Sequence, residues 1–223
     1  MLCVEESIGV EDAARIPRQR AQLPLECAVM YAEERHWEVF PGTWLEPGVG
    51  TEWCSCGASG CRAPGAHPAR EDWAAEATSS GGGARRLWTR RPKASVLLPT
   101  GRSFDVLDVP ESAGFLALAR MERMGVPLGP VACTPGRRVF FFVLPGGAAK
   151  APGLVRALGW SPATLGLAAH GENGWVPAPP TRVGGAGAVQ WVRRPTRTNR
   201  WLPDAEEVAS PLAYACGQEP ARR

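Results

Sequence analysis

The chain has 223 residues, of which 44% are hydrophobic and 21% charged, which is ordinary for a soluble globular protein. No apolar run approaches the roughly 20 residues that cross a bilayer, and residues 1–22 lack the apolar core of a secretory signal. A membrane or secreted protein is thereby disfavoured, and a cytoplasmic location is expected. The formal net charge of +3 is too small to predict nucleic-acid binding by itself.

After a polar extension over residues 1–22, which we expect to be loosely held, periodicity and turn residues predict the elements in chain order. In the first half these are a helix over 25–35, a strand over 37–40, a Gly-, Pro- and Cys-rich loop over 48–68, a flexible stretch over 79–83 and a short helix over 84–91. Next come two apolar strands joined by a Thr-Gly turn within 97–110, a helix from 110 to 125, and a hairpin over 131–133 and 138–144.

The second half continues with a helix over 154–160, strand-like pieces over 165–169, 174–176 and 188–192, and a C-terminal helix that begins near 203–204. This order predicts an α+β fold with a mixed sheet flanked by helices, into which the Cys-rich loop is inserted. We expect one domain over residues 23–203, followed by a C-terminal helix and tail over 204–223.

The stretch over residues 97–111 is informative because it places acids on an otherwise apolar strand. A buried carboxylate is costly unless it is paired or binds a cation. Since strand side chains alternate between faces, Asp108 should share a face with Val106 and Pro110, whereas Asp105 should point the other way. The pattern indicates a metal-binding strand that lacks one of two ligands. The alternative is that these acids cap the following helix or bind an arginine.

The Cys-rich loop contains four potential metal ligands with the spacing C-x-C-x4-C-x5-H, namely Cys54, Cys56, Cys61 and His67. Zinc is held by four such ligands in a tetrahedron, and short spacings let one loop surround the ion. Because all four ligands come from the protein, the zinc would be structural. Three of the seven cysteines lie in this loop, which in a cytosolic chain favours a metal site over disulfides. The alternative is reduced loop cysteines with an incidental histidine.

Two groups of arginines could bind phosphates. Arg137 and Arg138 follow a Gly turn at the start of a predicted strand, an arrangement that can hold a phosphate or form a solvated edge. A second group, between Trp191 and Trp201, could follow a nucleic-acid backbone while the rings stack on bases, and it consists of Arg193, Arg194, Arg197 and Arg200. The alternative is a solvated tail with tryptophans in the core.

Taken together, several short blocks resemble the bifunctional DNA primase/polymerase N-terminal domain, a branch of the archaeo-eukaryotic primase superfamily, and most of all its actinobacterial members with a cysteine loop. The resemblance runs from Leu25 to Pro203 and depends on the order and spacing of the blocks. They are Tyr31-Ala32-Glu33, residues 37–41, Gly65-Ala66-His67-Pro68, Pro99-Thr100-Gly101, Thr134-Pro135-Gly136-Arg137, Ala178-Pro179-Pro180-Thr181 and Gln190-Trp191.

The resemblance implies a template-dependent nucleotidyltransferase that uses an acidic pair on one strand, a histidine after a Thr-Pro-Ser-Gly-Gly-Arg-type turn and a third aspartate on a later strand. The acids would hold two Mg²⁺ or Mn²⁺ ions, and the histidine would contact the phosphates of the nucleotide. Here the first acid corresponds to Asp108, its partner to Pro110, the histidine to Arg138 and the third aspartate to a position near Ala168.

Only one of the four catalytic positions is therefore kept. Asp105 could replace the missing acid only through a bulge, and Glu111 only if the end of the strand bends. His170 and Glu172 lie close to the third position and are further candidate substitutes.

These observations lead to a primase/polymerase-like domain that has lost catalysis but binds nucleotide or nucleic acid, with DNA as the expected polymer, in a role related to replication. Arg137 and Arg138 would contact phosphates, because arginine retains affinity for them. One alternative is an active primase/polymerase that uses Asp108 with Glu111 or Glu172, and another is a regulator that binds only proteins. Because the chain ends soon after the domain, we expect any unwinding to come from a separate helicase or replication protein.

Overall fold

The computed structural model describes residues 23–48, 51–196 and 200–218, so the predicted N-terminal extension lies outside the described residues. The helices are α1 (Pro24–Arg35), α2 (Trp73–Glu76), α3 (Gly81–Arg90), α4 (Glu111–Arg123), α5 (Gly147–Ala157) and α6 (Ala205–Gly217), with a 3-10 turn at Gly184–Ala186. The strands are β1 (Phe40–Pro41), β2 (Leu45–Pro47), β3 (Glu52–Cys54), β4 (Val96–Pro99), β5 (Asp105–Pro110), β6 (Val131–Thr134), β7 (Arg138–Val143), β8 (Ala168–His170), β9 (Trp175–Pro177) and β10 (Gln190–Arg193).

A five-stranded sheet with the order β10-β6-β7-β5-β8 forms the centre of the molecule. A three-stranded sheet with the order β1-β4-β9 and the β2-β3 hairpin accompany it. The expected α+β class is confirmed, while the sheet, expected to be mixed, pairs its described strands only in antiparallel fashion. The two strands flanking the Thr-Gly turn, β4 and β5, belong to different sheets, so the turn passes the chain from one sheet to the other.

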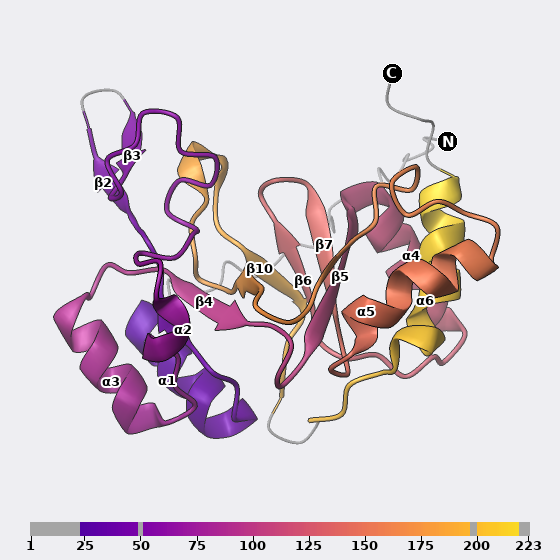
Figure 1. Cartoon of the computed structure of the whole chain (residues 1–223), viewed down its shortest axis with the longest axis horizontal. Coiled ribbons are helices and arrows are strands. Elements are labelled where there is room, and N and C mark those ends of the chain that lie inside the picture. Colours follow the sequence, from indigo (N-terminus) through magenta and orange to yellow (C-terminus); the bar gives the residue numbers. More distant parts are fainter. Residues whose placement is uncertain (1–22, 49–50, 197–199, 219–223) are drawn as a thin grey trace, which may run out of the picture.

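The central sheet is covered differently on its two faces (Figure 1). Helices α4, α5 and α6 lie on one face and pack against alternate residues such as Leu107, Val109 and Phe141. The other face meets an aromatic core shared with α1 and the small sheet, in which Trp37 stacks on Phe142 with ring centroids 5.4 Å apart. A strand that is apolar on both faces suits such a central place, and β7 pairs with a neighbour on each side, as predicted.

Several of the short blocks singled out in the sequence meet in this aromatic core. The indole nitrogen of Trp191 donates to the Tyr31 hydroxyl at 2.9 Å, and that hydroxyl donates to the Pro179 carbonyl oxygen at 2.8 Å. The Thr181 hydroxyl, also buried, donates to the Val96 carbonyl at 2.9 Å. Residues from both halves of the chain therefore satisfy one another's buried polar groups, as close packing requires.

The stretch over residues 79–83, expected to be flexible, instead forms the start of α3. Ser80 caps the helix, with its Oγ accepting from the Gly83 backbone N–H at 3.4 Å. A side-chain carbon at Gly83 would lie 2.5 Å from the Thr78 Oγ1. The prediction was wrong because the Gly run was interpreted as a linker, whereas glycine here lets the first turn of the helix approach its neighbours.

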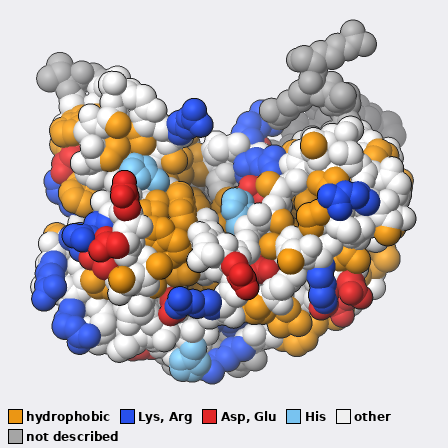
Figure 2. All heavy atoms as spheres, viewed as in Figure 1, with side chains coloured by type: hydrophobic (Ala, Val, Ile, Leu, Met, Phe, Trp, Pro, Cys, Tyr) orange, Lys and Arg blue, Asp and Glu red, His pale blue; other side chains and the backbone are white. Residues whose placement is uncertain are grey.

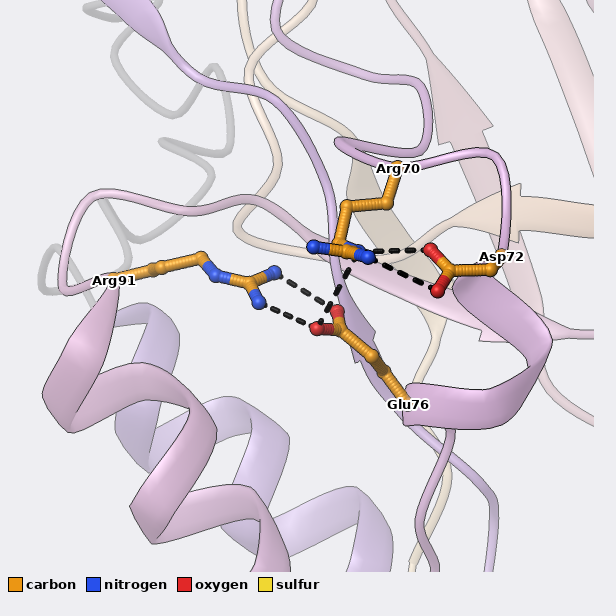
Figure 3. A network of polar contacts seen from close by, with 4 residues as sticks. All are labelled: Arg70, Asp72, Glu76 and Arg91. Atoms are coloured by element: carbon orange, nitrogen blue, oxygen red, sulfur yellow. Dashed lines mark hydrogen bonds and ion pairs between the residues drawn. The ribbon is translucent and has the colours of Figure 1, made fainter.

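A polar network fastens the segment after the Cys-rich loop to the end of α3 (Figure 3). Arg91 holds Glu76 with both terminal nitrogens, at 2.5 Å and 2.9 Å, and Arg70 binds Asp72 at 2.7 Å and 3.0 Å. The Glu76 side chain is 21% exposed and that of Arg91 25% exposed, so the pair is partly shielded from water. The network therefore helps to fix where the loop joins the body of the molecule.

Two helices in the second half differ from expectation in their extent or their role. Helix α5 begins at Gly147 rather than near Leu154, because Pro152 within it disguised the helical pattern. Helix α6 begins where predicted, but it packs on α4 and α5 and buries Val208 and Leu212 in their core. The domain boundary at residue 203 stays a prediction. None of the helices in the described part of the chain has the length and apolar character of a membrane-spanning segment.

Candidate functional site

The central sheet brings the four positions implied by the family resemblance onto one face. Strand β5 pairs with β7 and β8, so that Asp108 lies opposite Phe140 on one side and Ala168 on the other. Pro110 lies opposite Arg138 in the same ladder. Since every second residue shares a face, Asp108, Pro110, Ala168 and Arg138 are neighbours there. The predicted alternation of β5 is confirmed.

Asp108 is bound by two nitrogen-bearing side chains. The Arg138 Nε donates to Oδ1 at 2.6 Å, and the His170 Nε2 lies 3.1 Å from Oδ2. The Nη2 of Arg138 also donates to the backbone oxygens of Asp108, at 3.0 Å, and Gly166, at 2.7 Å. Because the residue is only 8% exposed, the arginine compensates a carboxylate that has lost most of its water.

The other acids proposed from the sequence do not join Asp108. Asp105 points to the helical face, where its Oδ2 accepts from the Ala148 backbone N–H at 2.9 Å in the first turn of α5. Glu111 binds Arg137 at 3.1 Å. Glu172 is exposed, and its Cα would lie 2.5 Å from a side-chain carbon at Gly101. Asp105 thus contacts the start of α5 rather than the helix that follows its strand, whereas Asp108 and Glu111 bind arginines. Within the described residues, no further acid joins Asp108 and His170 in a group of three potential metal ligands.

The Cys-rich loop gathers its four potential ligands. The sulfur atoms of Cys54, Cys56 and Cys61 and a ring nitrogen of His67 all lie within 4.8 Å of one another. Throughout the part of the chain that the structure describes, this is the only group of three or more Cys, His, Asp or Glu side chains arranged in this way. His67 Nε2 lies 3.4 Å from the Cys54 sulfur, while Nδ1 lies 2.9 Å from the Pro68 carbonyl, which would fix the ring orientation.

The protonation of these cysteines also suits a cation. Burial raises the pKa of the Cys54 thiol, but backbone N–H donors of Cys56 and Gly65 outweigh it and lower that pKa to about 6. Burial, together with the neighbouring Cys54 and Cys56 sulfurs, raises the pKa of Cys61 to about 11. One thiolate is thus favoured by the loop itself, and the removal of a further proton requires a positive charge nearby. The group is compatible with a zinc ion.

The second arginine group lies away from Asp108. Arg193 pairs with Val131 at one end of β6, whereas Arg138 pairs with Thr134 at its other end, about 10 Å further along the strand direction. Arg194 and Arg200 are exposed, and Arg197 lies outside the described residues. The two tryptophans of this region differ in burial. Trp191 is 9% exposed and belongs to the core, whereas Trp201 is 44% exposed.

The space-filling view shows the molecule hollowed between the half that carries α1 to α3 and the half that carries α4 to α6 (Figure 2). Lys and Arg side chains stand on both walls of this hollow. Positive side chains around a depression attract anions, because the field of the surrounding charges is concentrated there.

The sequence singled out Asp108, Arg138 and His170, and the alternative of an acid that binds an arginine describes Asp108, but neither Arg138 nor His170 was named as its partner. The acid and the arginine were each assigned to a ligand, although Arg138 lies across from Pro110 and within reach of Asp108. The sequence contained one indication of this contact. Pro110 stands where a second acid is expected, and the acid that remains, Asp108, can then be compensated by a neighbouring cation. The part played by the Gly166 carbonyl depends on a loop that the sequence does not position.

A family comparison agrees with this geometry. The sequence model of the family described as bifunctional DNA primase/polymerase, N-terminal, matches residues 28–207. No curated protein and no solved structure matches the chain. The matched region includes Asp108, Arg138, the Cys/His loop and the whole central sheet. The chain therefore belongs to the family of bifunctional DNA primase/polymerase N-terminal domains.

Proposed function

We propose that this primase/polymerase-like domain has lost metal-dependent nucleotidyl transfer and binds nucleotide or nucleic acid, in a role related to replication. One observation carries the proposal, namely that both carboxylate oxygens of Asp108 are engaged, by Arg138 at 2.6 Å and by His170 at 3.1 Å. A polymerase needs carboxylates that are open to divalent ions.

The surroundings of Asp108 support the loss of the metal site. A magnesium ion is held by oxygen ligands, usually one or two carboxylates together with substrate phosphates and water. Pro110 and Ala168, on the same face, offer no oxygen from their side chains. The Arg138 guanidinium also places a positive charge where an ion would have to bind, and repulsion adds to the lack of ligands.

Binding of nucleic acid is supported by the arginines around the end of β10. Within the described residues, no carboxylate forms an ion pair with Arg193, Arg194 or Arg200. Cations that lack such partners are available to phosphates. Arg137 and Arg138 are weaker candidates for phosphate contacts, because Glu111 and Asp108 already bind them.

The decisive experiment measures incorporation of labelled nucleotides on a primed and on an unprimed DNA template, with Mg²⁺ and with Mn²⁺. We expect no incorporation above that of a heat-denatured sample, together with retained binding of single-stranded DNA at low salt. Incorporation that disappears in Asp108→Asn would overturn the proposed loss of catalysis. Failure to bind DNA, RNA and nucleotides would instead favour a domain that contacts only proteins.

A reconstructed site provides the matched control. The combined changes Pro110→Asp, Ala168→Asp and Arg138→His place two carboxylates beside Asp108 and remove the competing cation. Three acids that repel one another should bind Mn²⁺, so Mn²⁺ should raise the melting temperature of this variant and leave that of the native chain unchanged. An equal rise in melting temperature with Mn²⁺ for Arg138→His alone would show that the two added acids do not form the site.

We also propose that the Cys54, Cys56, Cys61 and His67 cluster holds one structural zinc ion. Elemental analysis of the purified chain should find about one zinc per molecule. Cys56→Ser should lose the zinc and lower the melting temperature, because metal binding contributes folding energy. Cys133→Ser, which changes a half-buried cysteine outside the cluster, should retain the metal. A chain purified without zinc and equally stable contradicts this proposal.

A cytoplasmic location and a separate helicase or replication protein as partner remain our predictions. The location is supported by cysteines gathered around a potential metal site, an arrangement that a reducing compartment preserves. Co-purification of the chain with replication proteins from its own host tests the partner.

A further inference from the structure

A separate pocket lies at the C-terminal end of β10, away from Asp108. It has a volume of about 310 Å³ and is lined by Gly129, Pro130, Arg193, Arg194 and Thr196. No acidic side chain is among these lining residues. A concave site with two guanidinium groups and no carboxylate favours an anionic ligand.

Both arginines reach the same pocket because the strand is irregular there. Consecutive residues of a regular strand point to opposite faces. The pairing of β10 with β6 shifts register between Trp191 and Arg193, and Arg194 follows the last residue of the strand. Because the strand ends at Arg193, regular alternation no longer sets the direction of Arg194, and both residues line the same pocket.

Most of the guanidinium N–H groups of Arg193 and Arg194 are available to a ligand. The Nε of Arg193 donates to the Leu128 carbonyl at 3.3 Å, which fixes the stem of the side chain. Within the described residues, no hydrogen bond or ion pair engages the terminal nitrogens of Arg193 or the guanidinium of Arg194, whose charge acts only at a distance on the Cys27 thiol and the Tyr31 hydroxyl. A fixed guanidinium with unoccupied terminal nitrogens is suited to bidentate binding of a phosphate.

Further positive charge lies beside one lining residue of the pocket, Thr196. Arg35, at the end of α1, donates to the Thr196 carbonyl at 2.7 Å and lies over the Trp37 ring at 4.9 Å. Burial and the nearby charge of Arg200 lower the pKa of Arg35, so the two cations repel each other. A bound anion would relieve that repulsion, which adds to the contacts with Arg193 and Arg194.

The opposite wall of the pocket is backbone that cannot move easily. A side-chain carbon at Gly129 would lie 2.7 Å from the Phe142 carbonyl and 3.0 Å from Pro203. The Pro130 carbonyl accepts from the Phe142 N–H at 3.2 Å. These backbone groups form part of the pocket lining and hold its shape.

We propose that this pocket binds a phosphate monoester, either the terminal phosphate of a nucleic-acid strand or that of a free nucleotide. A monoester offers up to two negative charges and three oxygens at the end of a molecule, whereas a phosphodiester continues on both sides. Two guanidinium groups in one pocket match the former, because a monoester offers them more negative charge and more terminal oxygens. The inference rests on the proposed function, since it names the group that the basic region recognises.

The test compares fluorescent single-stranded DNA of one sequence with a 5′-phosphate, with a 3′-phosphate and with hydroxyl groups at both ends, using the full chain. A phosphorylated end should bind about tenfold more tightly than the hydroxyl ends, since charge-assisted contacts are lost without it. Nucleoside monophosphate is added as competitor to distinguish the sources. Arg194→Ala should abolish the preference for the phosphorylated end.

Arg90→Ala is the matched control, because it removes another exposed arginine, at the end of α3 opposite to the first turn that packs beside Glu33. It should keep the preference. Tight binding of all three strands without preference overturns the pocket but leaves the proposed function standing. A rise in melting temperature with the nucleoside monophosphate, with no binding of any strand, assigns the pocket to free nucleotides and overturns the proposed nucleic-acid binding. No binding of any probe overturns both.

Discussion

The carboxyl group of Asp108 lies where water hardly reaches it, and Arg138 compensates for the lost hydration. The carboxylate is 8% exposed, and the guanidinium binds one of its oxygens at 2.6 Å. The contact that we propose to exclude a metal ion therefore also stabilises the fold.

Arg138→Ala should reduce the free energy of unfolding by about 3 kcal/mol, because it leaves a partly buried carboxylate without its main partner. The neighbouring Arg137→Ala is the control, since the Arg137 side chain is 67% exposed and its ion pair with Glu111 should contribute less than about 1 kcal/mol. Urea unfolding of both variants measures the difference.

The combination Asp108→Asn with Arg138→Ala should recover part of the loss, because the unpaired charge is then gone. Similar losses for Arg137→Ala and Arg138→Ala would mean that Asp108 does not depend on this partner. In that case His170, 3.1 Å from the other oxygen, would be sufficient.

Among the elements, α6 illustrates how a surface charge can set the start of a core helix. Asp204 caps it by accepting from the Glu206 backbone N–H at 3.0 Å, and Lys150 binds the other carboxylate oxygen at 2.9 Å. The contact with Lys150 and the N–H of Glu206 lower the pKa of Asp204 below its ordinary value of 3.8. The ionised form is therefore the one that stabilises the folded state.

Asp204→Ala should cost about 1 kcal/mol of unfolding free energy at pH 7, as for other N-caps. Because the pKa is lower in the folded state, the stabilisation is fully present above pH 3.8 and is lost as the pH falls through the lower folded value. Urea unfolding from pH 7 to pH 3 should show the gap between the two proteins closing only at the acid end.

Ser80→Ala provides the comparison, since it removes an uncharged cap from α3. Its cost should not vary with pH. A gap for Asp204→Ala that stays constant down to pH 3 would show that the carboxylate acts there without its charge.

The elements also show what the sequence could predict. Helix α1 and the β6-β7 hairpin were found because their periodicities and their ends are local. The start of α3 was missed, since three glycines carry no periodicity and their use depends on contacts with Glu33 and Thr78. The face of the sheet to which a strand residue points was also predictable, because side chains alternate along a strand. Asp108 and Asp105 were therefore assigned correctly to opposite faces.

The partners of those side chains were less predictable. That His170 reaches Asp108 depends on the pairing of β5 with β8, two strands separated by some 60 residues of chain. Nothing local in either strand determines which register they adopt. The Cys/His group was predictable because all its ligands come from one loop.

Over the whole molecule, the small net charge of +3 conceals an uneven distribution. Arg85, Arg91, Arg137 and Arg138 have acidic partners in the described part of the chain, whereas Arg193, Arg194 and Arg200, at or beyond the end of β10, form no ion pair there. Long-range attraction of a polyanion should therefore be concentrated at that end.

The salt dependence of DNA binding tests this distribution. Each phosphate contact on a single strand releases counterions and contributes about −0.7 to the slope of log K against log salt concentration. Contacts by Arg193, Arg194 and Arg200 should give a slope of about −2. Arg200→Ala should make the slope less steep by about 0.7, whereas Arg90→Ala, on α3, should not change it. A slope that changes equally in both variants would mean that the strand is held by charge spread over the surface rather than by the end of β10.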